Sequence, residues 1–208
     1  MIDIALDKDS VLYGTTQGNA NPNMPGVPTG ALWRIDKATA NCTLISYGDY
    51  PNSLSFVPKG TLDSTQEALV GYLDATYVRI NPTTGAVTTV GTDVLPDGLQ
   101  SSGDIVSVID GPTYLTVKGG TCDTFDCVVE VDPATGAAVG NLGSCGYGSV
   151  FGVAFWAGKL YGFTSTGDIF EFFKEDDGSI STNPIPASVD QFYGAGSTTA
   201  APPTDVPN

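Results

Sequence analysis

Short runs of apolar and β-branched residues, each bounded by Gly, Pro, Asn or Asp, follow one another along the whole chain. One example is INPTTGAVTTVG, residues 80–91, in which a polar turn separates two such runs. An Asx or Pro residue can open a tight turn, and a Gly near its end accepts the positive φ that a hairpin requires. The stretch therefore predicts two antiparallel strands joined by a hairpin turn.

The same hairpin signal occurs four times. The copies are LWRIDKATAN (32–41), YVRINPTTGA (77–86), VVEVDPATGA (128–137) and FFKEDDGS (172–179). The equivalent turn positions are Ala40, Gly85, Gly136 and Gly178. They lie about 42 to 51 residues apart, which is the range expected for propeller blades.

Two further matched segments precede each turn. The first set is 4–7, 54–57, 105–108 and 152–155, and the second set begins at Val11, Ala68, Thr113 and Lys159. Each repeat is therefore interpreted as strands A, B and C, the hairpin turn, and strand D. The A segments are short, apolar and rich in small residues, as inner strands near a crowded axis should be. We predict an all-β protein, a small β-propeller of four-stranded antiparallel blades.

The repeats divide one predicted domain, residues 1–200. They span about residues 3–48, 49–97, 98–146 and 147–190. Residues 191–202 are predicted to form a closing strand beside the N-terminal strand, because propellers avoid an open seam, and residues 203–208 are expected to be a flexible tail. A five-bladed ring and a fragment of a larger propeller are the alternatives.

The segments RINPTTGAVTTVG, EVDPATGA and GVAFWAGKLYGF resemble the degenerate propeller repeats of many uncharacterised secreted and cell-surface bacterial proteins. The resemblance implies a propeller fold and a secreted or cell-surface location. Such families include binding modules, adhesins and some enzymes, so it implies no reaction. The first repeat departs from the pattern, with Lys37 in place of Pro and Ala40 in place of Gly.

Because successive strands of a blade run in opposite directions, the connections between them divide between the two faces of the propeller. The B-to-C and D-to-A connections share one face, and both long B-to-C insertions, residues 16–30 and 118–127, belong to it. We call it the insertion face. Varied loops on a regular scaffold suit recognition of a sugar or polar ligand by stacking and hydrogen bonds, although drift in exposed loops gives the same pattern. The candidate ligand-binding residues are Asn19, Asn21, Tyr47, Asp49, Tyr50, Asp97, Phe125, Asp126 and Tyr147.

The charge balance argues against two classes of partner. The 208 residues include 8 basic and 23 acidic residues, a net charge of -15, which repels phosphate backbones and anionic lipid. We therefore expect no nucleic acid partner and no membrane insertion. The sequence contains no His, which excludes Ser-His-Asp catalysis and His-ligated zinc. No signal peptide is recognisable in MIDIALDKDS, so secretion is inferred from the cysteines and composition.

Four cysteines leave the disulfide pairing open. Cys122 and Cys127 could close a local loop, or Cys122 could lie opposite Cys145 across two strands, and Cys42 is expected to stay unpaired. Three acidic clusters could bind calcium: Asp7 with Asp9, Asp123 with Asp126, and residues 175–177. None has the full spacing of a calcium loop, so solvated turns are favoured and no metal or other cofactor is expected.

The predicted function is a non-catalytic extracellular module that binds a glycan or protein through the insertion face. The alternative is a polysaccharide hydrolase or lyase that uses carboxylates near the propeller axis. That alternative requires two close, water-accessible carboxyls with perturbed pKa values. A structural spacer is a third reading.

Overall fold

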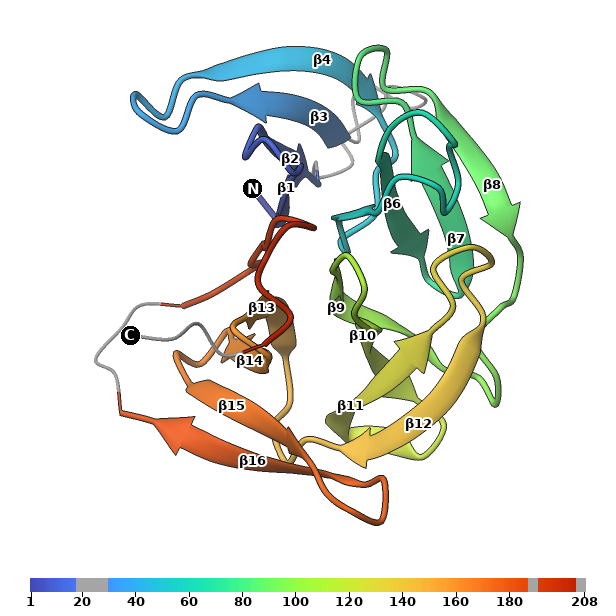
Figure 1. Cartoon of the computed structure of the whole chain (residues 1–208), viewed down its shortest axis with the longest axis vertical. Coiled ribbons are helices and arrows are strands. Elements are labelled where there is room, and N and C mark those ends of the chain that lie inside the picture. Colours follow the sequence, from blue (N-terminus) through green and yellow to red (C-terminus); the bar gives the residue numbers. More distant parts are fainter. Residues whose placement is uncertain (18–29, 187–190, 205–208) are drawn as a thin grey trace, which may run out of the picture.

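The computed structural model describes residues 1–17, 30–186 and 191–204, which form four four-stranded antiparallel sheets around an axis (Figure 1). The described residues contain no helix. The all-β propeller is confirmed, and its blades number four. The first blade consists of β1 (Asp3–Leu6), β2 (Leu12–Thr16), β3 (Gly30–Ile35) and β4 (Cys42–Gly48). The second consists of β5 (Ser55–Val57), β6 (Ala68–Leu73), β7 (Thr76–Ile80) and β8 (Val87–Gly91). The third consists of β9 (Gln100–Ser107), β10 (Thr113–Gly119), β11 (Cys122–Val131) and β12 (Ala138–Ser144). The fourth consists of β13 (Val150–Trp156), β14 (Lys159–Thr164), β15 (Ile169–Lys174) and β16 (Ile180–Ile185).

In each blade the first strand lies innermost and the last lies outermost. The inner strands β5 and β9 are almost wholly buried, whereas the outer strands β4 and β8 are largely exposed. This order follows from the sequence, because the small apolar A segments fit the crowded axis.

The four predicted hairpin turns are present between the third and fourth strands of the blades. Their left-handed positions have φ values of 57° at Ala40, 74° at Gly85, 75° at Gly136 and 84° at Gly178. In the second blade the Asn81 side chain accepts hydrogen bonds from two backbone amides of its own turn, at 2.8 and 3.0 Å. The turn chemistry inferred from INPTTG is therefore confirmed.

Apolar clusters fill the interfaces between successive blades. The cluster between the second and third blades contains Tyr72, Tyr77 and Leu115, and the one between the third and fourth contains Phe170. Buried tyrosines also tie neighbouring blades together, since Tyr72 Oη donates to the Gly136 carbonyl at 2.6 Å. Buried hydroxyls need such a partner to offset their desolvation.

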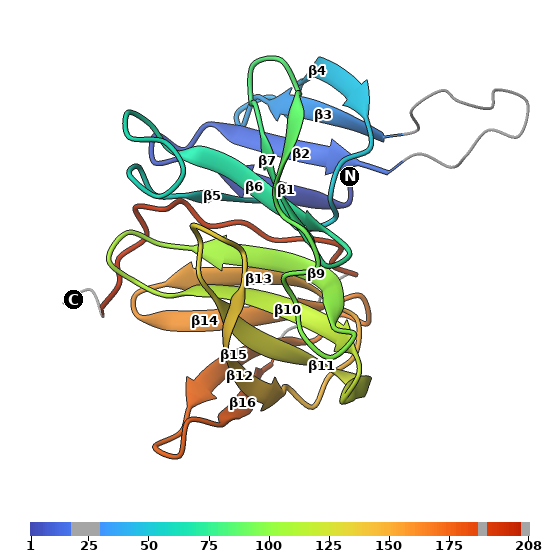
Figure 2. The ribbon, with the colours of Figure 1, turned by 90° about the vertical axis from the view of Figure 1, so that its right-hand side faces the viewer.

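Between the fourth and first blades lies the closing segment, residues 191–204 (Figures 1 and 2). It is not the β-strand predicted for 191–202: its one bridge is a parallel contact of Thr198 with Leu6. Its backbone instead passes close to the inner strands, and a Cβ on Gly194 would lie 2.5 Å from Asp3 Oδ1. Regular pairing is lost because its polar groups are shared among several blades.

At the face opposite the insertions, the closing segment contacts a turn of every blade. Thr198 Oγ1 donates to the Asp7 carbonyl at 2.8 Å, and the Ile109 amide donates to the Thr199 carbonyl at 2.8 Å. Thr199 also hydrogen-bonds Glu67, and the Gly158 amide donates to the carbonyl of Pro202. This segment therefore covers one end of the axis.

Candidate functional site

Of the two predicted insertions, residues 118–127 are described by the structure, whereas most of residues 16–30 are not. The predicted residues Asn19 and Asn21 lie outside the described residues. Residues 118–127 keep only part of the predicted loop: β10 and β11 extend into them, but the pairing passes directly from Val117 opposite Cys127 to Gly119 opposite Cys122, so residues 123–126 loop out of the ladder. Gly119 and Gly120 have φ values of 88° and 55°. Two successive positive φ values let the hairpin turn tightly, so the insertion consists of this turn and the looped-out residues 123–126.

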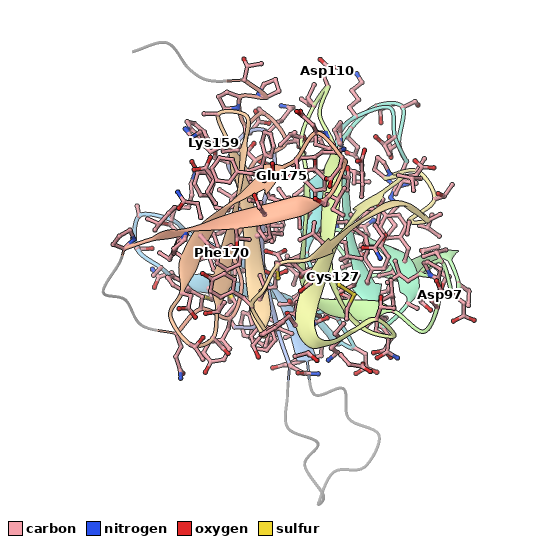
Figure 3. The ribbon with its side chains drawn as sticks, turned by 90° about the horizontal axis from the view of Figure 1, so that it is seen from below. Asp97, Asp110, Cys127, Lys159, Phe170 and Glu175 are labelled. Atoms are coloured by element: carbon pink, nitrogen blue, oxygen red, sulfur yellow. A yellow bond between two sulfur atoms is a disulfide. The ribbon has the colours of Figure 1, made fainter. Side chains whose placement is uncertain are left out.

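A disulfide joins Cys122 and Cys127 near the end of this hairpin, and the alternative bond between Cys122 and Cys145 is wrong (Figure 3). Bulges in the pairing of β11 with β12 place Cys127 opposite Ser144. A simple hairpin count had placed Cys122 opposite Cys145. Cys145 is instead a buried free thiol that hydrogen-bonds the Asp126 carbonyl at 2.8 Å, and burial raises its pKa to about 11. Cys42 is free and exposed.

Two of the candidate residues are part of the framework. Tyr50 is buried, and its hydroxyl donates to the Gly85 carbonyl at 2.9 Å. Asp126 is buried as well and accepts the Val150 amide at 2.7 Å, and burial raises the pKa of its carboxyl. Their side chains hold adjacent blades together.

The other described candidates are more accessible. Tyr47 is 64% exposed, and Asp49, Asp97 and Phe125 are exposed too, with Asp97 at the periphery in Figure 3. Tyr147 is half-buried and stacks on Phe170, with ring centroids 4.1 Å apart.

One groove gathers part of the candidate set. The Asp126 amide donates to the Tyr147 carbonyl at 2.8 Å, so the strand that carries Phe125 and Asp126 lies beside Tyr147. A groove of about 380 Å³ opens here, lined by Gln100, Lys118, Gly119, Cys122, Asp123, Thr124, Asp126, Gly148 and Ser149. Tyr47 and Asp49 are not among the residues that line this groove.

A smaller pocket of about 190 Å³ marks the axis at the insertion face. Its lining residues come from every blade and from the closing segment: Ile2, Gln17, Asn52, Gly103, Phe151 and Tyr193. The Phe151 and Tyr193 rings are nearly parallel, with an interplanar angle of 19° and centroids 6.4 Å apart. We call this the axial pocket. The candidate list missed all six of these residues, although Phe151 and Tyr193 each precede a Gly in an A-like segment.

Below the axial pocket lies a pair of buried carboxyls, Asp3 and Asp104. They directly follow the lining residues Ile2 and Gly103, and they are 1% and 0% exposed. Asp104 accepts the Ile105 and Val153 amides at 2.7 Å each, and Asp3 Oδ1 accepts the Ile4 amide at 2.8 Å. Burial raises the pKa of both carboxyls well above the ordinary value, and the neighbouring Asp104 raises that of Asp3 further.

Two of the three acidic clusters considered for calcium lie in turns, whereas Asp123 and Asp126 lie in β11. Asp7 Oδ1 accepts the Asp9 and Val11 amides, and Asp177 accepts the Ser179 amide, each at 2.8 or 2.9 Å. No group of three or more Cys, Asp or Glu side chains suited to a metal gathers within residues 1–17, 30–186 and 191–204.

Comparisons with known proteins find no matching family model and no matching curated protein. Among solved structures, the chain resembles an oligogalacturonate lyase in complex with manganese, at 16% identity and a TM-score of 0.46 over 85% of this chain and 51% of that one. It also resembles the hydrazine synthase of Kuenenia stuttgartiensis, at 11% identity and a TM-score of 0.46 over 91% of this chain and 55% of the other. The chain spans about half the length of these proteins. At this level of similarity, neither protein indicates an activity for this one.

No helix among the described residues is long and apolar enough to cross a membrane.

Proposed function

We propose that the protein is an extracellular, non-catalytic binding module that takes a glycan at the axial pocket of its insertion face. The observation that carries the proposal is the chemistry of that pocket. The Phe151 and Tyr193 rings offer apolar faces, while Asn52 and Gln17 offer amide donors and acceptors. Rings with adjacent amides suit a sugar, which has apolar C–H faces and a rim of hydroxyls.

The volume of the pocket limits the size of the proposed ligand. Its volume of about 190 Å³ is below the roughly 300–1,000 Å³ of sites for drug-sized ligands. The proposed ligand is therefore one terminal sugar unit, with the rest of the glycan lying over the insertion face. An extracellular location is supported by the disulfide between Cys122 and Cys127, since such bonds persist in oxidising compartments.

The carboxyl pair favours a second candidate, a polysaccharide hydrolase or lyase. Two carboxyls with raised pKa values lie close together beneath a pocket. Three features weigh against it. Neither carboxyl is accessible, and Asp104 already accepts backbone amides with both oxygens. The carboxyls also contact each other, whereas glycoside hydrolysis uses separations of about 5 Å or more.

A glycan array probed with the wild-type protein and with Phe151→Ala and Tyr193→Ala tests the proposal. Loss of one stacking ring should weaken each positive glycan about tenfold, which is about 1.4 kcal/mol. Trp156→Ala is the matched control, because Trp156 is an exposed aromatic residue on the same strand β13 but at the opposite end. An array without positive glycans, or equal losses in the control, would contradict the proposal. Reducing-end release that disappears in Asp104→Asn would favour the hydrolase instead.

A further inference from the structure

We infer that Asp3 and Asp104 share one proton at the propeller axis, and that this protonated pair is the hub that fastens the closing segment to the four blades. The inference does not depend on the proposed glycan site. It rests on the hydrogen bonds of the two side chains and on the positions of the strands that meet there.

Asp104 has the bonding pattern of an ionised carboxylate. Its Oδ1 accepts the amide of Ile105 on its own strand, and its Oδ2 accepts the amide of Val153 in the fourth blade, both at 2.7 Å. The amide of Ala195 in the closing segment also donates to this carboxylate. A carboxylate with three amide donors is stabilised in its charged form.

Asp3 has a different pattern. Its Oδ1 accepts the Ile4 amide at 2.8 Å, and the Leu54 amide of the second blade also donates to the carboxyl. Its Oδ2 is buried, and no donor from the described residues reaches it. The carboxyl of Asp104 lies within hydrogen-bonding range instead. Two carboxylate oxygens cannot bond each other without a hydrogen, whereas a protonated Asp3 donates from Oδ2 to Asp104 and leaves no orphan atom.

The donors explain why the axis needs this pair. The inner strands β1, β5, β9 and β13 are sheet edges, so their inward amides lack a partner in their own sheets. The five donors, Ile4, Leu54, Ile105, Val153 and Ala195, come one from each blade and one from the closing segment. Two carboxyl groups satisfy them all at one point.

The backbone amides around the two carboxyls favour a shared proton over a bound metal cation. Backbone amides present positive hydrogens, which repel a metal ion and attract negative oxygen. Two acidic side chains on the surrounding elements bond elsewhere: Glu67 reaches the closing segment at Thr199, and Asp126 reaches β13 at Val150.

The hub makes the fold sensitive to alkali. Burial raises the pKa of the coupled pair, so the folded protein keeps one proton that the unfolded chain releases near pH 4. The contribution of the pair to stability is therefore greatest at acidic pH and falls as the pH rises toward the raised pKa. Above that pKa two adjacent negative charges repel each other, and the closing segment should loosen.

Thermal unfolding of the wild type and Asp3→Asn from pH 4 to 9 tests this inference. An Asn keeps both bonds, because its oxygen accepts from Ile4 and its amino group donates to Asp104, but it carries no proton to lose. We expect the difference in Tm, variant minus wild type, to rise steadily with pH. The matched control is Asp97→Asn, an exposed aspartate, whose difference should stay flat. A difference for Asp3→Asn that is independent of pH, or that falls with pH, would overturn the inference.

The wild type alone provides a second measurement if the variant does not fold. Carboxyl ¹³C NMR should show one coupled pair of aspartates that releases its proton at a pH well above the ordinary aspartate range, with loss of amide hydrogen-exchange protection in residues 191–204 over the same pH range. Titration of both Asp3 and Asp104 in the ordinary aspartate range would exclude the shared proton.

Discussion

Removal of the disulfide between Cys122 and Cys127 should destabilise the protein by an amount that its short loop sets. The bond joins buried residues that are 5 positions apart, with Cα atoms separated by 5.7 Å. Closing so short a loop removes little entropy from the unfolded chain, about 2 kcal/mol on the chain-entropy model. For a domain of this size, about 2 kcal/mol corresponds to a fall in Tm of about 4–8 °C.

The perturbation is the double variant Cys122→Ala, Cys127→Ala, measured by urea unfolding at neutral pH. Alanine is preferred to serine, since a buried hydroxyl without a partner would add a cost of its own. Cys145→Ala is the control, because Cys145 is equally buried but forms no disulfide. Subtracting twice the loss in the control leaves the contribution of the cross-link. A remainder below about 0.5 kcal/mol, or above about 4 kcal/mol, would refute the loop argument.

Two further predictions concern the hairpins and the free thiols. Ala40→Gly should raise the free energy of unfolding by about 1 kcal/mol, since a non-Gly residue is strained at a φ of 57°. Gly136→Ala should lower the free energy of unfolding by about 2 kcal/mol or more, because the added Cβ would lie 2.4 Å from the Tyr77 side chain. Denaturant titration of both variants checks the pair, and a loss of stability in Ala40→Gly would contradict it. At pH 8 iodoacetamide should modify the exposed Cys42 and leave Cys145 unmodified, because burial raises the pKa of Cys145 to about 11. Mass spectrometry after peptide digestion measures the modification of both cysteines. Similar rates of modification in the folded protein would contradict the burial of Cys145.

The candidate site shows the limit of sequence reasoning. Exposed Tyr, Asn and Asp residues in long connections were chosen because loops carry function, but Tyr50 and Asp126 turned out to be buried ties between blades. Exposure is a property of packing, and a polar residue in a connection has the same local pattern whether it faces solvent or a neighbouring sheet. The axial pocket was missed for the related reason that its lining comes from all four blades and the closing segment.

The sequence by itself determined the four hairpins, the antiparallel blades and the inner position of the A segments. Those features depend on neighbouring residues, through turn chemistry and the alternation of apolar positions. Tertiary structure alone decided three others: a register jump between β10 and β11 brought Cys122 and Cys127 together, the closing segment left the sheets, and Asp3 met Asp104 from about a hundred residues away. Each depends on the register of distant strands around a common axis. An isolated Asp before an apolar run gives no sign that its partner lies two blades farther along the chain.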